Sequence, residues 1–171
     1  ILGGEPGSRL VHPNDHVNLG QSSNDVIPTA IHLAALMSSR ENLAPALQKL
    51  STELSKKSEE FWPIVKTGRT HLQDATPVRL GQEFLGFAGQ TENSLKRLAR
   101  MDTALAEVAL GGTAVGTGVN THPEFSARTC RVLAEMTGVD IKETSNHFQA
   151  QSTLDALVEA SGELKTIAIS L

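Results

Sequence analysis

The sequence predicts an all-α fold, a bundle of long helices preceded by an irregular N-terminal segment. Three observations support this fold class. Aromatic residues are sparse, with one Trp, five Phe and no Tyr among 171 residues, whereas Ala, Leu, Ser, Glu and Thr abound. Leucines recur on one stripe at helical spacing from Leu36 to Leu54. Glycines recur inside a second helical pattern, where close packing of helices is the natural reason to keep Gly81, Gly86 and Gly89.

The composition excludes several function classes. The net charge is −4, from 15 basic and 19 acidic residues, and the basic residues are scattered, so no nucleic-acid partner is expected. No apolar run reaches the roughly 20 residues that a bilayer requires, and no signal-peptide pattern opens the chain. We therefore expect a soluble, cytoplasmic protein without a membrane partner. The lone Cys130 lies in a helical pattern and is expected to be a small buried hydrophobe.

Residues 1–23 are expected to be irregular, because six Gly and Pro residues occur there without a sustained period. The backbone N–H groups after Pro13 could face an anion, with Arg9 and His12 adding charge or donors. A metal site through His12 and His16 is disfavoured, because Pro13 is expected to oppose the helix that would align them. A solvated turn is the alternative that the local sequence favours.

Residues 21–25 (QSSND) are small hydrogen-bonding side chains just before an apolar helical pattern. Such a cluster suits the N-terminus of a helix, with Asn24 or Asp25 as the capping residue. A helix N-terminus also offers free N–H groups and the positive end of a dipole, so the same residues can bind a carboxylate instead.

The helical pattern itself covers residues 26–61. Pro45 interrupts it, so we expect a kink or a break near residues 41–45. His32 in this stretch is expected to be a packed or surface histidine. Residues 61–65 (FWPIV) are too short for a helix and indicate an extended connector.

Residues 67–77 (TGRTHLQDATP) form a polar stretch between two helical patterns. Gly68 is expected to permit a backbone turn, and Pro77 to start the second helix. His71 offers an imidazole, a side chain that can give or take a proton, Thr70 beside it offers a hydroxyl, and a neighbouring arginine favours anions. A solvated helix–helix connection explains the stretch equally well.

The second helical pattern runs from Pro77 to about Leu110 and meets a glycine-rich loop at residues 110–121 (LGGTAVGTGVNT). The loop lacks the spacing and the lysine of a P-loop, so a nucleotide is disfavoured. It either approaches something small and polar or is a plain connector. A further helix is expected over residues 123–138, an irregular stretch over residues 139–151, and a last helical pattern from there to the end of the chain.

Four segments closely resemble class II fumarate hydratase, of the aspartase/fumarase superfamily. They are residues 11–18 (VHPNDHVN), 21–25 (QSSND), 68–77 (GRTHLQDATP) and 111–118 (GGTAVGTG). The likeness covers essentially the whole chain and keeps the order of the family. It implies the central helical domain of that superfamily.

The resemblance also implies how the chain is divided. Residues 1–23 would be the C-terminal end of the N-terminal domain, and residues 24–171 the first part of the central helical bundle, truncated at Leu171. The catalytic serine of the family, on a mobile glycine-rich loop, and a Lys and Asn that bind substrate would lie beyond Leu171. An upstream Ser/Thr substrate segment would lie before Ile1. The chain alone is therefore expected to be inactive.

Roles for individual residues follow from the same resemblance. His71 would match the catalytic histidine of proton transfer. The residues that would match substrate-binding positions are Ser22, Ser23, Asn24 and Thr70. The residues that would match a second dicarboxylate site are Arg9, His12, Asn14 and Asp15. No metal or cofactor is implied.

The implied activity is the reversible hydration of fumarate to L-malate, a step of the tricarboxylic acid cycle, by a homotetramer whose subunits pool their central helices. Adding water across the double bond develops an aci-carboxylate, so anchored hydrogen-bond donors stabilise the transition state more than the substrate. A base takes the C3 proton of malate, and an acid assists the loss of the hydroxyl.

Two alternatives remain open. The first is aspartate ammonia-lyase of the same superfamily, which usually shows Ser-Thr-Asn and a different residue before the proline. Ser22-Ser23-Asn24 and Ala75-Thr76-Pro77 favour fumarase. The second is a non-catalytic helical-bundle protein, since relatives of this superfamily serve as lens crystallins. A purely structural protein needs none of the polar stretches, which favours an enzyme.

Overall fold

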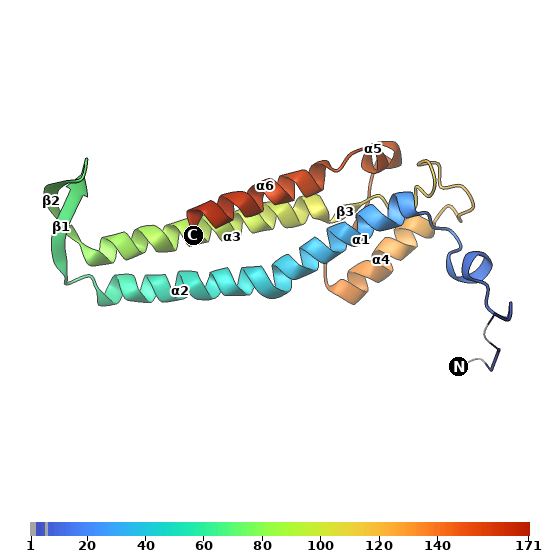
Figure 1. Cartoon of the computed structure of the whole chain (residues 1–171), viewed down its shortest axis with the longest axis horizontal. Helices are drawn as coiled ribbons and strands as arrows, with labels where there is room; N and C mark the ends of the chain where they lie inside the picture. The colour runs from blue at the N-terminus through green and yellow to red at the C-terminus, as the bar shows by residue number, and fades with distance from the viewer. Residues whose placement is uncertain (1–2, 6) are drawn as a thin grey trace. The chain divides into compact units, whose positions relative to one another are not determined.

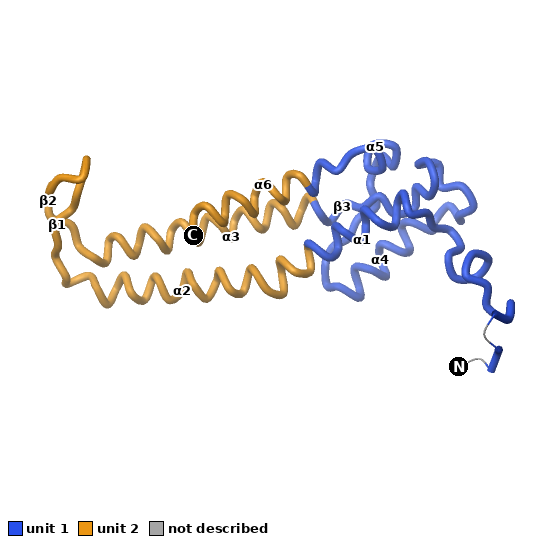
Figure 2. Tube along the Cα trace, in the orientation of Figure 1, with its two compact units in different colours: residues 1–35, 105–157 blue, residues 36–104, 158–171 orange. Residues whose placement is uncertain are grey.

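The computed structural model describes residues 3–5 and 7–171 and is predominantly helical, as the sequence predicts (Figure 1). The chain divides into two compact units, each made of separate stretches of sequence (Figure 2). Unit 1 comprises residues up to Ala35 together with Leu105–Leu157, and unit 2 comprises Leu36–Ala104 with Val158–Leu171. No helix in the described part of the chain is long and apolar enough to span a bilayer. The domain boundary expected after residue 23 stays a prediction.

Unit 1 holds the short elements and the start of the first long helix. Its elements are a π-helical turn η1 (Pro13–Val17), most of α1 (Ser23–Ser38), β3 (Glu107–Val108), α4 (Phe125–Thr137), β4 (Lys142–Glu143) and α5 (His147–Ser152). The strands β3 and β4 pair in parallel. Gly138 ends α4 with a φ of +67°, a left-handed conformation that glycine adopts without strain, as the sequence predicts. The stretch expected to be irregular from residue 139 to 151 contains β4 and most of α5 instead.

Unit 2 is a helical bundle that carries a β-hairpin. Its elements are η2 (Ser39–Leu43), α2 (Ala44–Glu60), β1 (Val65–Thr70), β2 (Gln73–Arg79), nearly all of α3 (Leu80–Leu105) and most of α6 (Asp155–Ser170). Arg97 and Arg100 of α3 face Glu163 of α6 at 3.7 and 3.1 Å. The Ser58 hydroxyl of α2 donates to the Gly81 carbonyl of α3 at 2.8 Å. Side-chain contacts thus join α3 to both of its neighbours.

The break expected near residues 41–45 is confirmed. The π-helical turn η2 separates α1 from α2, and Pro45 stands in the first turn of α2. Proline is tolerated there because the first N–H groups of a helix have no intrahelical partner. The sequence patterns did not single out Pro28, which lies inside α1.

The polar stretch between the helices forms an antiparallel hairpin, which the sequence patterns did not predict. Pro77 lies in β2 opposite Thr67, and α3 begins only at Leu80, so the expectation that Pro77 starts the helix was wrong. In a two-stranded ribbon each strand has a free edge, where a residue without an N–H is tolerated. Gly68 does not make the turn either. It lies at a register shift in β1, where a Cβ would come within 2.7 Å of the Thr76 carbonyl oxygen.

Close packing explains one of the three helical glycines. A Cβ at Gly81 would meet the Ser58 carbonyl oxygen at 2.3 Å, so α3 can start against the end of α2 only with glycine there. At Gly86 and Gly89 a Cβ would meet nothing within 4 Å among the described residues. The predicted stripe is buried at Leu36 and Leu47, and the same core includes Leu98, Met101, Ala160 and Ile167.

Candidate active site

The predicted substrate-binding residues Ser22, Ser23 and Asn24 form the N-terminus of α1 in unit 1. The Ser22 Oγ accepts a hydrogen bond from the Asn24 N–H at 3.2 Å, and the Asp25 Oδ1 accepts one from the Ser22 N–H at 2.9 Å. This reciprocal arrangement resembles a capping box, and Ser22, rather than Asn24 or Asp25, is the residue before the helix. Ser23 and Asn24 are exposed, so their side chains are accessible to a ligand.

Asp25 joins this helix start to the glycine-rich loop. Its side chain is completely buried, and its Oδ2 accepts hydrogen bonds from the N–H groups of Gly111 at 3.0 Å and Thr113 at 2.9 Å. A carboxylate away from water needs such donors, because burying it unpaired is very unfavourable. The loop therefore closes over the start of α1 with Asp25 as its centre.

The glycine-rich loop at residues 110–121 is held from several sides. Two N–H groups of the loop donate to the Gly112 carbonyl at 2.9 and 3.0 Å. The Nε2 of Gln151 in α5 donates to the Thr113 carbonyl at 2.6 Å. Thr113 is 3% exposed and has a φ of +54°, which a β-branched residue rarely adopts. The Thr113 hydroxyl is therefore turned away from solvent. The loop contributes to unit 1 by packing around Asp25.

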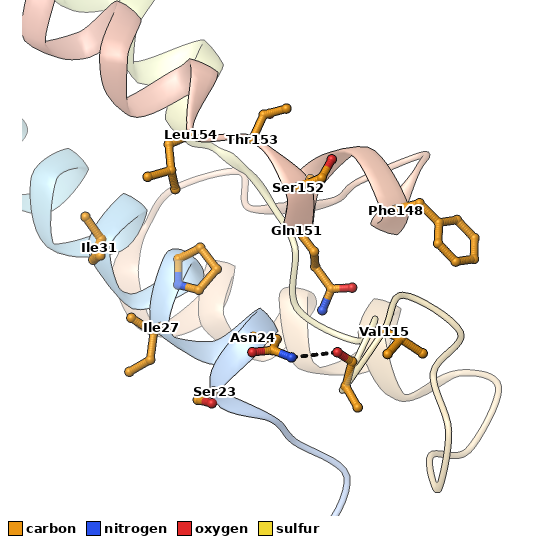
Figure 3. Close-up of a pocket in the computed structure, with 13 residues that line it drawn as sticks. Ser23, Asn24, Ile27, Ile31, Val115, Phe148, Gln151, Ser152, Thr153 and Leu154 are labelled. Atoms are coloured by element: carbon orange, nitrogen blue, oxygen red, sulfur yellow. Dashed lines mark hydrogen bonds between the residues drawn. The ribbon is translucent and has the colours of Figure 1, made fainter.

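A pocket of about 540 Å³ lies beside the N-terminus of α1 (Figure 3). Ser23 and Asn24 line its polar edge, and the Asn24 Nδ2 donates to the Ala114 carbonyl at 2.6 Å. The rest of the lining is mostly apolar and includes Ile27, Pro28, Ile31, Val115, Phe148 and Leu154. Two of the predicted substrate-binding residues therefore stand at the rim of a largely apolar hollow.

The residues expected at a second dicarboxylate site lie in and before η1, also in unit 1. They are Arg9, His12, Asn14 and Asp15. Pro13 is the first residue of η1, so the expectation that it opposes a helical turn was wrong: its fixed φ suits the first helical position. His12 caps the turn, with its Nδ1 3.2 Å from the Asp15 backbone nitrogen and 3.1 Å from the Asp15 Oδ2.

His12 and His16 are neighbours in this turn. The His16 Nδ1 accepts a hydrogen bond from the His12 N–H at 2.9 Å, so the contact runs through the backbone. Among residues 3–5 and 7–171, no three His, Cys, Asp or Glu side chains form a group that could hold a metal ion.

Thr70 and His71 belong to unit 2, at the tip of the hairpin. Thr70 is the last residue of β1, and His71 and Leu72 form the two-residue turn with φ values of +50° and +58°. Both angles are positive, which is the conformation that favours Asn and Gly. An ordinary side chain there costs about 1–2 kcal/mol per residue, and such strain gathers at functional sites. Thr70, His71 and Leu72 are all exposed.

The structure brings together one part of the predicted site. Ser22–Asn24, the glycine-rich loop and the predicted second site share unit 1, whereas Thr70 and His71 belong to unit 2. The sequence patterns indicated Asp25 as a possible cap of the helix but missed its contacts with the glycine-rich loop, which lies 86 to 88 residues later. They missed Gln151 altogether, because no local pattern connects it with a loop 38 residues earlier.

Two other histidines are packed against carbonyl groups in unit 1. The His32 Nδ1 lies 3.2 Å from the Leu105 carbonyl oxygen and 3.0 Å from that of Glu107, so His32 is a packed histidine, as expected. The His147 Nδ1 lies 3.1 Å from the Ala109 carbonyl oxygen, and its Nε2 lies 3.0 Å from the Glu143 Oε1. These contacts tie β3 and β4 to their neighbours.

Known proteins resemble this chain throughout its length. A class II fumarate hydratase from Halobacterium salinarum is 56% identical over 157 residues, which cover 92% of this chain and 33% of that protein. One from Nitrosomonas europaea is 55% identical and covers 100% of this chain, which spans 37% of that protein. The chain thus spans about a third of the length of the curated relatives that it matches.

Solved structures agree with the sequence relatives. The crystal structure of a recombinant class II fumarase from Schistosoma mansoni superimposes with a TM-score of 0.94 at 38% identity, covering 98% of this chain and 38% of that one. A family described as lyase matches residues 1–171. The resemblance seen in the four motifs is therefore confirmed, and the chain belongs to this lyase family.

Proposed function

We propose that this chain is part of a class II fumarate hydratase, which interconverts fumarate and L-malate by adding or removing water. The observation that carries the proposal is identity of 52–56% with curated relatives of that name over 92–100% of the chain. The aligned stretch includes every residue from the start of α1 to the glycine-rich loop. The capped and exposed start of α1 supports the same reaction.

The start of α1 suits a substrate carboxylate. A helix N-terminus carries a partial positive charge, and Ser23 and Asn24 offer accessible donors beside it. In the hydration of fumarate, one carboxylate takes up extra negative charge as the aci-carboxylate forms. Donors that are fixed before the reaction stabilise that charge without further reorganisation, which lowers the barrier.

His71 is the proposed group for proton transfer, and Thr70 beside it is proposed to hold a carboxylate. An imidazole can give or take a proton near neutral pH, and the tip of an exposed hairpin presents it to a ligand. The strained φ values of the tip support a functional role, since a hairpin without one would gain from Asn-Gly there.

The proposal includes a homotetramer, in which one active site draws Ser22–Asn24 and Thr70–His71 from different subunits. Exposed apolar side chains support burial against another chain, because large apolar groups left in water are unfavourable. In α1 they include Ile27 and Ile31, 55% and 46% exposed, and in α6 Val158 and Ile169, 69% and 75% exposed.

A second dicarboxylate site is also part of the proposal. It would be formed by Arg9, His12, Asn14 and Asp15. The cytoplasmic location stays a prediction.

The test is an assay of the full-length gene product with fumarate, followed by the loss of the ultraviolet absorbance of its double bond. The expected result is conversion to L-malate and the reverse reaction from L-malate. Parallel reactions with fumarate plus ammonia test the ammonia-lyase alternative, since formation of aspartate would support it. A folded protein that converts neither substrate would favour the non-catalytic bundle.

A further inference from the structure

Asp25 stands between two parts of the candidate site, and the family resemblance assigns it no role. We propose that Asp25 is a positioning residue: it orients Ser22 and the Asn24 side chain for dicarboxylate binding by joining the start of α1 to the glycine-rich loop. This inference rests on the proposed function and adds a residue that does not itself touch substrate.

The two oxygens of the Asp25 carboxylate hold two different elements. Oδ1 accepts from the Ser22 N–H at 2.9 Å, and Oδ2 accepts from the N–H groups of Gly111 at 3.0 Å and Thr113 at 2.9 Å. Every partner is a donor, so both oxygens must act as acceptors. A side chain with one acceptor and one donor cannot satisfy both elements at once.

The loop in turn makes a hydrogen bond with a side chain of α1. The residue after Thr113 is Ala114, and its carbonyl accepts from the Asn24 Nδ2 at 2.6 Å. The contacts therefore close a ring through Asp25, Thr113, Ala114 and Asn24. Because its Nδ2 is held, the plane of the Asn24 amide is set, and so is the direction of the Oδ1 and of the second N–H. Asp25 thereby acts on a predicted substrate-binding side chain through the loop.

Thr113 is kept in place from both sides. Asp25 binds its N–H, and the Gln151 Nε2 binds its carbonyl at 2.6 Å. Thr113 has a φ of +54°, an unfavourable conformation for a β-branched residue, so the loop would relax there if these contacts were lost. A relaxed loop would shift the Ala114 carbonyl and release Asn24.

The experiment compares variants of the full-length gene product with fumarate and L-malate as substrates. Asp25→Asn keeps the shape of the side chain but places a donor against an N–H group. We expect kcat/KM to fall by about 10–100-fold, because displacing an orienting group by about 1 Å can reduce the rate 100-fold. Amide hydrogen exchange at Ser22, or at Gly111 and Thr113, should accelerate. This measurement reports the hydrogen bonds of Asp25 and needs no substrate.

Gln151→Met provides a second variant that keeps the charge of the site. It removes the donor to Thr113, and it also removes the Gln151 Oε1, a buried atom with no hydrogen-bond partner in the described part of the chain. The expected loss of kcat/KM is about 2–10-fold, the worth of one hydrogen bond. Ile141→Val is the matched control, since Ile141 is 5% exposed in the same unit: it should lower Tm and leave kcat/KM within about twofold of wild type.

Three outcomes would overturn the inference. Asp25→Asn with faster exchange but kcat/KM within twofold of wild type would leave Asp25 a purely structural role. If Asp25→Asn does not fold, Gln151→Met decides, and an unchanged kcat/KM for it would overturn the proposal. A wild type that does not hydrate fumarate would remove the function on which the inference rests. The exchange rates would then still show whether Asp25 holds the loop, which distinguishes the two failures.

Discussion

His71 and Leu72 occupy the two central positions of one hairpin turn, with φ values of +50° and +58°. Leu72 is 95% exposed, so no packing within the described part of the chain compensates for its conformation. His71 is the side chain proposed for proton transfer, whereas Leu72 has no proposed role in catalysis and contributes backbone strain. Substitutions at the two positions should therefore separate catalysis from stability.

Replacing His71 by Asn should lower kcat/KM by about 10²–10⁴-fold, the usual contribution of a general acid or base. Asn tolerates positive φ well, so the stability of the full-length protein should be unchanged or slightly higher. Reversibility requires kcat/KM to fall by the same factor for fumarate and for L-malate. Steady-state kinetics and a urea unfolding curve check both statements. Near-normal turnover would show that His71 is not a catalytic residue.

Replacing Leu72 by Gly should stabilise the hairpin by about 0.5–1 kcal/mol. Relief of the left-handed conformation contributes about 1–2 kcal/mol, and the extra freedom of glycine in the unfolded chain opposes it by about 0.5–1 kcal/mol. The measurement is the free energy of unfolding in urea. A loss of stability would mean that Leu72 packs against another chain, and sedimentation would then show a weakened oligomer.

His12→Asn should leave kcat at the main site within about threefold of wild type. The His12 imidazole caps η1 through Asp15, and an Asn side chain caps equally well. If residues 9–15 form a second dicarboxylate site, the variant should also bind dicarboxylate more weakly at that site, which equilibrium titration measures. A loss of turnover as large as that of the His71 variant would place His12 in the main site.

Gly81→Ala should destabilise the protein by about 1–3 kcal/mol, the usual range for overpacking. The added Cβ would meet the backbone of Ser58 and Trp62, which cannot move aside as a flexible side chain can. Gly86→Ala is the control in the same helix, since a Cβ there meets nothing within 4 Å of the described residues. It should raise stability by roughly 0.5–1 kcal/mol through helix propensity. Equal effects of the two substitutions would contradict this packing.

Cys130 should resist alkylation while the protein is folded. Burial raises the pKa of the Cys130 thiol, and a hydrogen bond with Ser126 opposes the shift only in part. The folded state therefore holds the thiol proton more tightly than the unfolded state does. This contribution to stability is present below the pKa of the unfolded chain and is lost as the pH rises through the higher pKa of the folded chain. Iodoacetamide labelling at pH 8, with and without denaturant, measures the difference, and fast labelling of native protein would contradict it.

The sequence patterns predicted the features that depend on neighbouring residues. Pro45 implied the break that η2 provides, and Gly138 implied the end of α4, because each acts on its own backbone. The hairpin was missed for an equally local reason. Its strands lack a regular apolar alternation, and its turn consists of His71 and Leu72 where Asn-Gly would be typical.

The candidate site was only partly predictable. The motif at Ser22–Asp25 indicated a helix start, and the family resemblance supplied the roles of its members. No local pattern could show that Asp25 binds Gly111 and Thr113, since the partners lie 86 and 88 residues away. Contacts at such separation depend on tertiary packing, which spacing along one helix does not report.

The separation between Asp25 and its loop partners also orders events during synthesis. A ribosome adds about 5–20 residues per second, so the Asp25 carboxylate exists for roughly 5–20 seconds before Thr113 has been made. Throughout that interval the start of α1 can form its own capping box but not its final contacts. The nascent chain must therefore keep this acidic group in water until the glycine-rich loop emerges, and the segment predicted to bind substrate is among the late parts of unit 1 to become rigid.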